Sequence, residues 1–179
     1  MPALKEYKKQ TPEDWEALPE TRAAELIDGV IYDMAAPSSM HQWLVTRIAS
    51  RIDRYIDDHD GTCRVYVAPF AVALDEDRLE PDISVICDPD KIDEKGCNGA
   101  PDWIIEVTSP ATRSRDYVYK LNKYLTYGCK EYWIVNPDSR TVVVFDFTGG
   151  TGSDTYHFEN DIPVGIYPGF SIRIAELIR

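Results

Sequence analysis

Hydrophobic positions recur along this chain with two different periods, which predict helices and strands. A period of four residues is carried by Leu44, Ile48, Ile52 and Ile56, the spacing of one face of an α-helix. The run 103–107 is apolar except at Glu106, as in a central strand that is buried on both faces. We therefore predict a long helix from Pro37-Ser38-Ser39 to about Asp58, and a buried strand at 103–107.

Turn signals divide the rest of the chain. Asp28-Gly29 separates two apolar runs and predicts a hairpin, and Thr11-Pro12 opens a short helix that Pro19 closes. Further strands are expected at 63–74, 82–87, 131–135 and 141–147, with shorter ones up to 174. A second helix at 112–127 ends at Gly128, and 149–152 is a glycine-rich loop. This order predicts an α/β (α+β) fold with a mixed β-sheet flanked by helices, formed by a single domain over 1–179.

Composition narrows the class of protein. The chain has 179 residues, 44% hydrophobic and 28% charged, with a net charge of −12. These values are typical of a globular protein and exclude a disordered acidic tail. The run 65–74 is too short to span a membrane, and charges in Met1–Glu6 do not fit a signal peptide, so a cytoplasmic protein is expected. The four cysteines form no CxxC pair and are expected to be reduced.

Three acidic residues occur where the pattern predicts burial. Asp82 opens an apolar strand, Glu106 lies within another, and Glu25 precedes Leu26-Ile27 in the hairpin. A buried carboxylate is costly unless it is paired or binds a metal. Converging carboxylates favour Mg²⁺ or Mn²⁺, which can activate water and stabilise charge on a phosphate. A structural ion pair with a basic residue explains Glu106 equally well, and both interpretations stay open here.

Several of these segments together resemble a known family. The segments are Glu25–Gly29, Pro37 with His41-Gln42, Pro81-Asp82, Ala100–Thr112, Asp116 with Lys120, and Gly128 with Glu131–Pro137. They resemble the Uma-two family of restriction endonucleases, within the PD-(D/E)xK nuclease superfamily. The resemblance covers about Glu25 to Pro137 and implies a restriction-endonuclease-like domain that hydrolyses DNA phosphodiester bonds with Mg²⁺ or Mn²⁺.

The resemblance also implies roles for individual residues. Asp82 and Glu106 would be the metal-binding acids, and Glu25 would be a third catalytic acid. The superfamily pattern places a lysine two residues after Glu106, where this chain has Thr108. In the Uma-two pattern the lysine moves to the following helix, and Lys120 stands there. From that helix its ammonium could reach the same point and assist the attacking water.

Two further residues, Asp102 and His41, have alternative interpretations. Asp102 also follows a proline and shares a strand face with Glu106 by the period of two. Asp82 is preferred because acids from neighbouring strands converge, whereas Asp102 fits the end of a loop. His41 would line the site or bind phosphate, although a lone histidine is more often structural.

The charge distribution bears on a DNA partner. Residues 108–130 hold five basic residues against one acidic residue, a net charge of +4, which leaves −16 elsewhere. Arg47, Arg51 and Arg54 form a second basic stripe. We expect weak, salt-sensitive DNA binding, with a solvated helix face as the structural alternative. A homodimer is expected if both strands are cut. The alternative functions are a catalytically inactive nuclease-like binding or assembly module and, with less support, a metal phosphatase acting on small nucleotides.

Overall fold

The computed structural model describes residues 8–19, 21–150 and 152–179. The charged segment Met1–Glu6 and Thr151 of the predicted glycine-rich loop lie outside these described residues. None of the helices in the described part of the chain is both long enough and apolar enough to cross a membrane.

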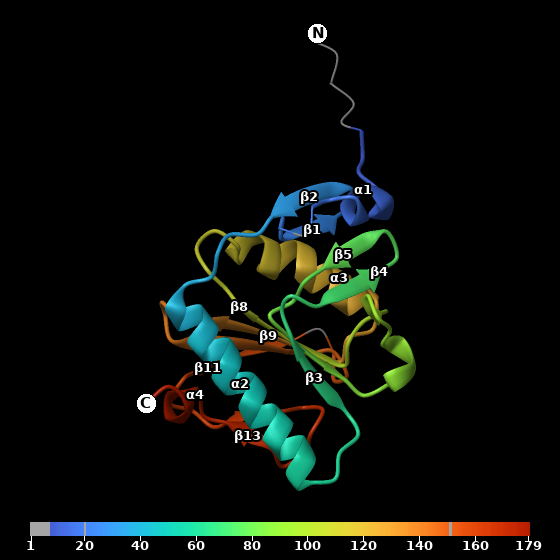
Figure 1. The fold of residues 1–179 in the computed structure, drawn as a ribbon. Helices are drawn as coiled ribbons and strands as arrows, with labels where there is room; N and C mark the ends of the chain where they lie inside the picture. Colours follow the sequence, from blue (N-terminus) through green and yellow to red (C-terminus); the bar gives the residue numbers. More distant parts are fainter. Residues whose placement is uncertain (1–7, 20, 151) are drawn as a thin grey trace.

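Helices and strands follow one another in a mixed order (Figure 1). The helical elements are α1 (Pro12–Glu16), α2 (Ser39–Asp58), η1 (Pro89–Lys91), η2 (Arg115–Lys120), α3 (Leu121–Thr126) and α4 (Ile174–Leu177). The first seven strands are β1 (Ala24–Ile27), β2 (Val30–Asp33), β3 (Arg64–Val67), β4 (Ala71–Leu74), β5 (Asp77–Leu79), β6 (Ile83–Ile86) and β7 (Gly96–Asn98). The remaining strands are β8 (Trp103–Val107), β9 (Glu131–Asn136), β10 (Thr141–Asp146), β11 (Ser153–His157), β12 (Ile162–Pro163) and β13 (Ser171–Ile172).

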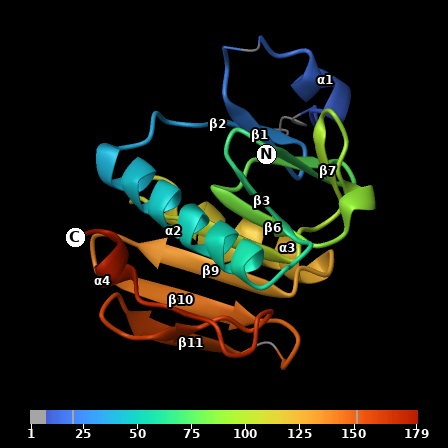
Figure 2. The same cartoon turned by 60° about the horizontal axis from the view of Figure 1, so that its bottom comes forward.

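A six-stranded sheet forms the centre of the molecule, in the order β11-β10-β9-β8-β6-β3. β8 and β9 are parallel, whereas the other neighbours are antiparallel. Helix α2 covers one face, and η2 with α3 lies against the other (Figures 1 and 2). Ile105 of β8 therefore packs in the α2 core, and Ile104 packs with Tyr124 of α3. The mixed sheet flanked by helices confirms the predicted fold class.

A smaller five-stranded sheet lies beside the α3 face, in the order β2-β1-β5-β4-β7. Its first hairpin turns at Asp28 and Gly29, whose φ angles of 53° and 80° are those of a type I′ turn. The predicted hairpin is thus confirmed. Because Glu25 lies on β1 of this hairpin, the small sheet carries it toward the central sheet.

Four local expectations differ from the structure. The predicted strand 63–74 is two strands, β3 and β4, which separate at Ala68-Pro69 and join different sheets. The second helix begins as the π-helical segment η2 rather than as regular α-helix. The predicted strand 82–87 is the shorter β6, which is buried at every position because α2 and the small sheet's core cover both faces. β5 and β7 were not predicted, since three-residue strands show no clear period.

The expectation that all cysteines are reduced is wrong for one pair. Cys63 and Cys87 form a disulfide, whereas Cys97 and Cys129 are free and buried. Cys63 precedes β3 and Cys87 follows β6, and these strands pair in antiparallel register from Arg64 with Ile86. The next register position therefore places the two cysteines opposite each other, although 24 residues separate them in sequence.

Candidate active site

Two of the predicted acids are cross-strand neighbours. Ile83 of β6 pairs with Ile105 of β8 in antiparallel register, so the next position places Asp82 beside Glu106. The Asp82 backbone N–H donates to Glu106 Oε2 at 3.4 Å. The Val107 backbone N–H donates to Asp82 Oδ2 at 2.7 Å. The sheet itself therefore brings the two carboxylates together at one end of β6 and β8.

Lys120 lies at the centre of a buried acidic cluster. Its Nζ is 2.8 Å from Glu25 Oε1, 2.9 Å from Glu106 Oε1 and 3.7 Å from Asp116 Oδ1. All four residues are at most 5% exposed. The Tyr124 hydroxyl also donates to Glu106 Oε1, at 3.4 Å. The structure therefore brings together Glu25, Glu106 and Lys120, which the sequence assigned to one site.

The cluster holds more negative than positive charge. Burial and the charge of Asp82 raise the pKa of Glu106 well above its ordinary value, although Lys120 works in the opposite direction. Burial likewise raises the pKa of Asp116. The three carboxylates around Lys120, Glu106 first, outweigh the burial of its ammonium and raise its pKa well above the ordinary value. Lys120 is therefore charged, and this one buried cation contacts three carboxyl groups.

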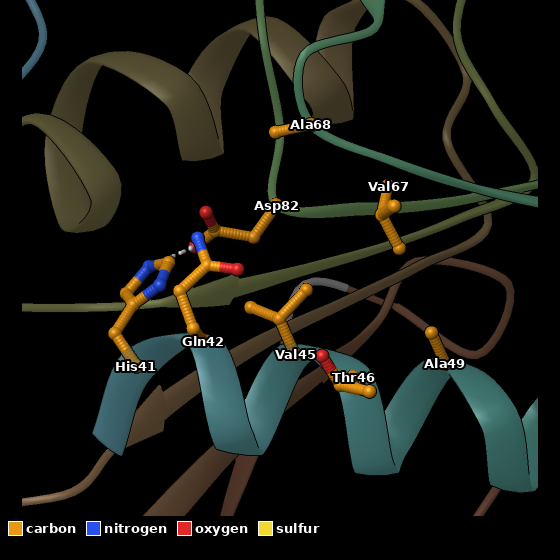
Figure 3. A pocket seen from close by; sticks show the side chains of 8 residues that line it. All are labelled: His41, Gln42, Val45, Thr46, Ala49, Val67, Ala68 and Asp82. Carbon is orange, nitrogen blue, oxygen red and sulfur yellow. Dashed lines mark hydrogen bonds and ion pairs between the residues drawn. The ribbon is translucent and has the colours of Figure 1, made fainter. Parts of the chain in front are cut away.

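His41 connects the site to an open groove. Its Nε2 lies 3.1 Å from Asp82 Oδ2, and because a carboxylate only accepts, Nε2 donates this bond. Burial lowers the pKa of His41, but the hydrogen bond to Asp82 and the negative charges of Asp82 and Asp116 together outweigh it, and the net shift is upward. The groove has a volume of about 240 Å³. Figure 3 shows the His41 ring and the Asp82 carboxylate facing each other at one end of this groove, which runs between α2 and the end of β3 and is also lined by Gln42, Val45, Thr46, Ala49, Val67 and Ala68.

Asp102 lies at the opposite end of β8. Its carboxylate accepts the Cys87 backbone N–H at 2.8 Å and pairs with Lys130 at 2.7 Å. Burial is the largest single influence and works against ionisation, but the bonds from Lys130 and the Cys87 N–H, together with the charges of Lys130 and Lys91, outweigh it and lower the pKa of Asp102. Of the two Pro-Asp pairs, the structure therefore places Asp82 next to Glu106 and holds Asp102 in a separate ion pair.

Two residues of the cluster had no predicted role. Asp116 belonged to the segments that resemble the family, and its position four residues before Lys120 places both on one helix face. Tyr124 is fully buried, and its hydroxyl contacts Glu106. The signal for both was their helical spacing from Lys120.

The basic segment after β8 differs from the expected DNA-facing surface. Lys120 is buried among carboxylates, and Lys123 forms ion pairs with Asp28 and Asp77. Lys130 pairs with Asp102. Neither the expected DNA-binding face nor its alternative, a solvated basic face, describes Lys120 and Lys123, whereas Lys130 is exposed but paired.

The donor atoms around Asp82 fit a magnesium ion. Within residues 8–19, 21–150 and 152–179, no group of three or more His, Cys, Asp or Glu side chains is arranged to hold a metal. Mg²⁺, however, is commonly bound through one or two carboxylates together with waters and substrate phosphates. Both hydrogen bonds of the Asp82 carboxylate go to Oδ2, and Glu106 Oε2 has only the long contact to the Asp82 N–H. Asp82 Oδ1 and Glu106 Oε2 are therefore the oxygens suited to such an ion.

Comparison with known proteins shows the family to which the chain belongs. A family model described as "Uma2: Putative restriction endonuclease" matches residues 10–175. The chain belongs to the Uma2 family. This confirms the resemblance drawn from the sequence and supports a nuclease-like function for this Uma2 protein. No curated protein sequence matches it.

A solved structure shares the fold of the Uma2 chain. It is described as a crystal structure of a "putative nuclease belonging to DUF820" from Anabaena variabilis ATCC 29413. The two chains are 24% identical and superpose with a TM-score of 0.78, over 94% of this chain and 97% of the other. The shared fold therefore extends over nearly the whole chain.

Proposed function

We propose that this Uma2 protein is a metal-dependent endonuclease that hydrolyses DNA phosphodiester bonds. The observation that carries the proposal is the cross-strand pair of Asp82 and Glu106, in which Asp82 lines an open groove and Glu106 lies behind it. The buried surplus of carboxylates behind this pair supports it, because a divalent cation would balance that charge. Membership of a family described as restriction endonucleases adds the substrate class.

Asp82 and Glu106 would hold Mg²⁺ or Mn²⁺, which when bound supplies positive charge to the phosphate and lowers the pKa of water. The chain's own residues prepare this site. His41 and the Val107 N–H both bond Asp82 Oδ2 and so fix the orientation of its carboxylate. In this arrangement Lys120 faces carboxylates, so we assign it to holding Glu106 ionised and in place. Its predicted contact with the attacking water requires the ammonium to move away from one of them.

Glu25 has a supporting role in this proposal. Its Oε1 contacts Lys120 Nζ and also accepts the Glu80 backbone N–H at 3.0 Å. Because both bonds reach the same oxygen, Glu25 holds the lysine against the sheet and does not face the groove, which it does not line. Glu25 would therefore position Lys120, whereas Asp82 and Glu106 would contact the metal.

The test is nicking of supercoiled plasmid DNA in Mg²⁺ or Mn²⁺. We expect the wild type to convert plasmid to the open-circular form, and Asp82→Asn and Glu106→Gln to lose this activity. Asp102→Asn is the matched control, because Asp102 is also a buried carboxylate beside β8 but lies at its other end. Cleavage that survives both site substitutions would contradict the assignment.

We also propose that the active species is a symmetric homodimer, which sedimentation at the assay concentration measures.

One observation favours a second function, a nuclease-like binding or assembly module without catalysis. Lys120 is enclosed by three carboxylates in the manner of a structural ion-pair network. Isothermal titration with Mn²⁺ separates the two functions. A nuclease would bind Mn²⁺ and lose this binding in Asp82→Asn. A binding module would show no heat of binding, and its stability would not depend on Mn²⁺.

A further inference from the structure

We propose that the substrate's phosphates are contacted by arginines on two elements beside the groove, the outer side of α2 and the start of η2, and not by Lys120, Lys123 and Lys130. This inference rests on the proposed function, since it names the surface through which DNA reaches that same site. We call these residues the arginine surface: Arg47 and Arg54 on α2, and Arg113 and Arg115 before and within η2.

The α2 part of this surface is one stripe of a helix. Trp43, Arg47, Ser50 and Arg54 follow one another at intervals of four, three and four residues, and all are exposed. This spacing keeps them on one side of the helix. At 1.5 Å per residue the stripe is about 16 Å long. It is opposite the apolar face, which packs on the central sheet.

The stripe borders the groove that leads to Asp82. Thr46 lines the groove, and it lies three residues after Trp43 and four before Ser50, so it also adjoins the stripe. Figure 3 shows Gln42 and Thr46 on the side of α2 that carries the groove. A DNA backbone that lies along the stripe would therefore pass the mouth of the groove.

The contacts of Arg47 occupy its Nε and one face of its guanidinium. Its guanidinium lies over the Trp43 ring, 5.4 Å from the ring centroid, and its Nε donates to the Leu177 backbone carbonyl. Stacking uses the face of the guanidinium, whereas phosphate is bound by the N–H groups in its plane. Trp43 is itself 44% exposed. The two terminal nitrogens of Arg47 can therefore bind a phosphate without a large loss of side-chain freedom.

The second part of the surface lies on the other side of His41. Arg115 is stacked over Tyr32 of β2, 5.1 Å from the ring centroid, and Arg113 is exposed. Only residues 34–38 separate β2 from the start of α2, and Val107, at the end of the strand that precedes η2, donates its backbone N–H to Asp82. The start of η2 is therefore linked through β2 and β8 to the surroundings of the His41–Asp82 pair.

The charge of the arginine surface indicates which ligand it binds. Among described residues, none of these four arginines forms an ion pair with a carboxylate, whereas Lys120, Lys123 and Lys130 all do. Exposed Asp53, Asp57 and Asp58 also lie on α2, at the end away from His41. In a chain with a net charge of −12, arginines without a carboxylate partner beside the carboxylate site fit a polyanion. Exposed Arg with an adjacent aromatic ring is a combination found at nucleic-acid interfaces. We therefore assign the surface to the DNA backbone.

Fluorescence anisotropy with a labelled 20-base-pair duplex tests this surface. Binding is measured in EDTA between 25 and 200 mM salt, so that no cleavage is needed. From the salt slope of about −0.9 per neutralised phosphate, one lost contact weakens binding by about tenfold at 50 mM salt. We expect this loss for each of Arg47→Ala and Arg54→Ala, with a salt slope lower by about 1 per arginine. Combining Arg113→Ala with Arg115→Ala should give a similar loss.

The matched control is the double variant Arg140→Ala with Arg173→Ala. It removes the same charge as Arg47→Ala with Arg54→Ala, but from exposed arginines already paired with Glu159 and Asp161. We expect wild-type binding in this control. Equal weakening of binding in Arg140→Ala/Arg173→Ala and in Arg47→Ala/Arg54→Ala would overturn the proposal. The proposal would also be overturned if the wild type did not bind the duplex at 25 mM salt, or if it bound an RNA duplex of the same sequence more tightly. Urea unfolding of each variant verifies that it is folded.

The outcomes for this surface and for the proposed function are separable. A protein that binds the duplex through these arginines but does not nick plasmid DNA supports the surface and contradicts the nuclease. A protein that nicks DNA, while its arginine variants bind like the wild type, supports the nuclease and overturns the surface.

Discussion

Replacing Lys120 with methionine isolates the energetic role of the buried cluster. Methionine retains most of the apolar volume of lysine but removes the cation that contacts Glu25 and Glu106 at 2.8 and 2.9 Å. Removal of one partner from a buried ion pair typically costs about 3–5 kcal/mol, because the other charge remains in a medium of low polarity. With a urea m-value of about 2 kcal/mol per M, the unfolding midpoint should fall by about 1.5–2.5 M.

The loss should also depend on pH. Without Lys120, the already raised pKa of Glu106 rises further above its unfolded value, so the native state binds more protons than the unfolded state. Stability then decreases as pH rises from the ordinary glutamate pKa through the folded value. We therefore expect Lys120→Met to be more destabilising at pH 8 than at pH 5.

Urea unfolding followed by tryptophan fluorescence measures both effects, since Trp103 and Trp133 are fully buried. Lys123→Met is the matched control. The Lys123 side chain is 20% exposed, and its buried partner Asp77 keeps the hydrogen bond from the Asp28 N–H, so we expect a smaller loss of about 1–2 kcal/mol. A loss below about 1 kcal/mol for Lys120→Met, or a loss equal at pH 5 and pH 8, would refute the reasoning that one cation stabilises this cluster.

Three further perturbations test other parts of the structure. Because the pKa of Glu106 is raised, the wild type should lose stability as pH rises above 4.5, and Glu106→Gln should remove this loss. The urea midpoint of the variant should therefore increase relative to that of the wild type as pH rises. Serine at both Cys63 and Cys87 should cost about 3 kcal/mol, because the disulfide closes a 24-residue loop in the unfolded chain, and reductant should lower the wild-type midpoint but leave the variant unchanged. Gly29→Ala should cost about 1–2 kcal/mol, because φ is +80° and the added Cβ would lie 2.8 Å from Lys9 Cβ; an unchanged thermal midpoint would contradict this.

Periodicity and turn chemistry made the main elements predictable. The four-residue repeat from Leu44 to Ile56 and the serine before it place α2 as the structure does, and Asp28-Gly29 places the first hairpin. Glu106 stood out because a carboxylate in a buried strand requires a partner. These features are local, so the sequence alone contains them.

What the sequence could not show depends on contacts between distant segments. The pairing of Lys123 with Asp28 and Asp77 joins residues from two turns that only the folded small sheet brings near α3. A count of charges therefore overestimated the basic character of the second helix. The Cys63–Cys87 bond similarly depends on the register of β3 and β6, which no pattern within either strand determines.

Because of the buried cluster, the candidate site depends on both the small sheet and the central sheet. Glu25 comes from the small sheet and Glu106 from the central sheet, and Lys120 contacts both. If the small sheet detached by partial unfolding, water would reach the lysine and the support behind Glu106 would be lost. Because Lys120 joins the two sheets, we expect that the small sheet does not open by itself and that amide protons of β1 exchange with solvent in the same cooperative event as those of β8. A chain still being synthesised or partly unfolded would accordingly lack an assembled site, which would confine any cleavage to the completely folded protein.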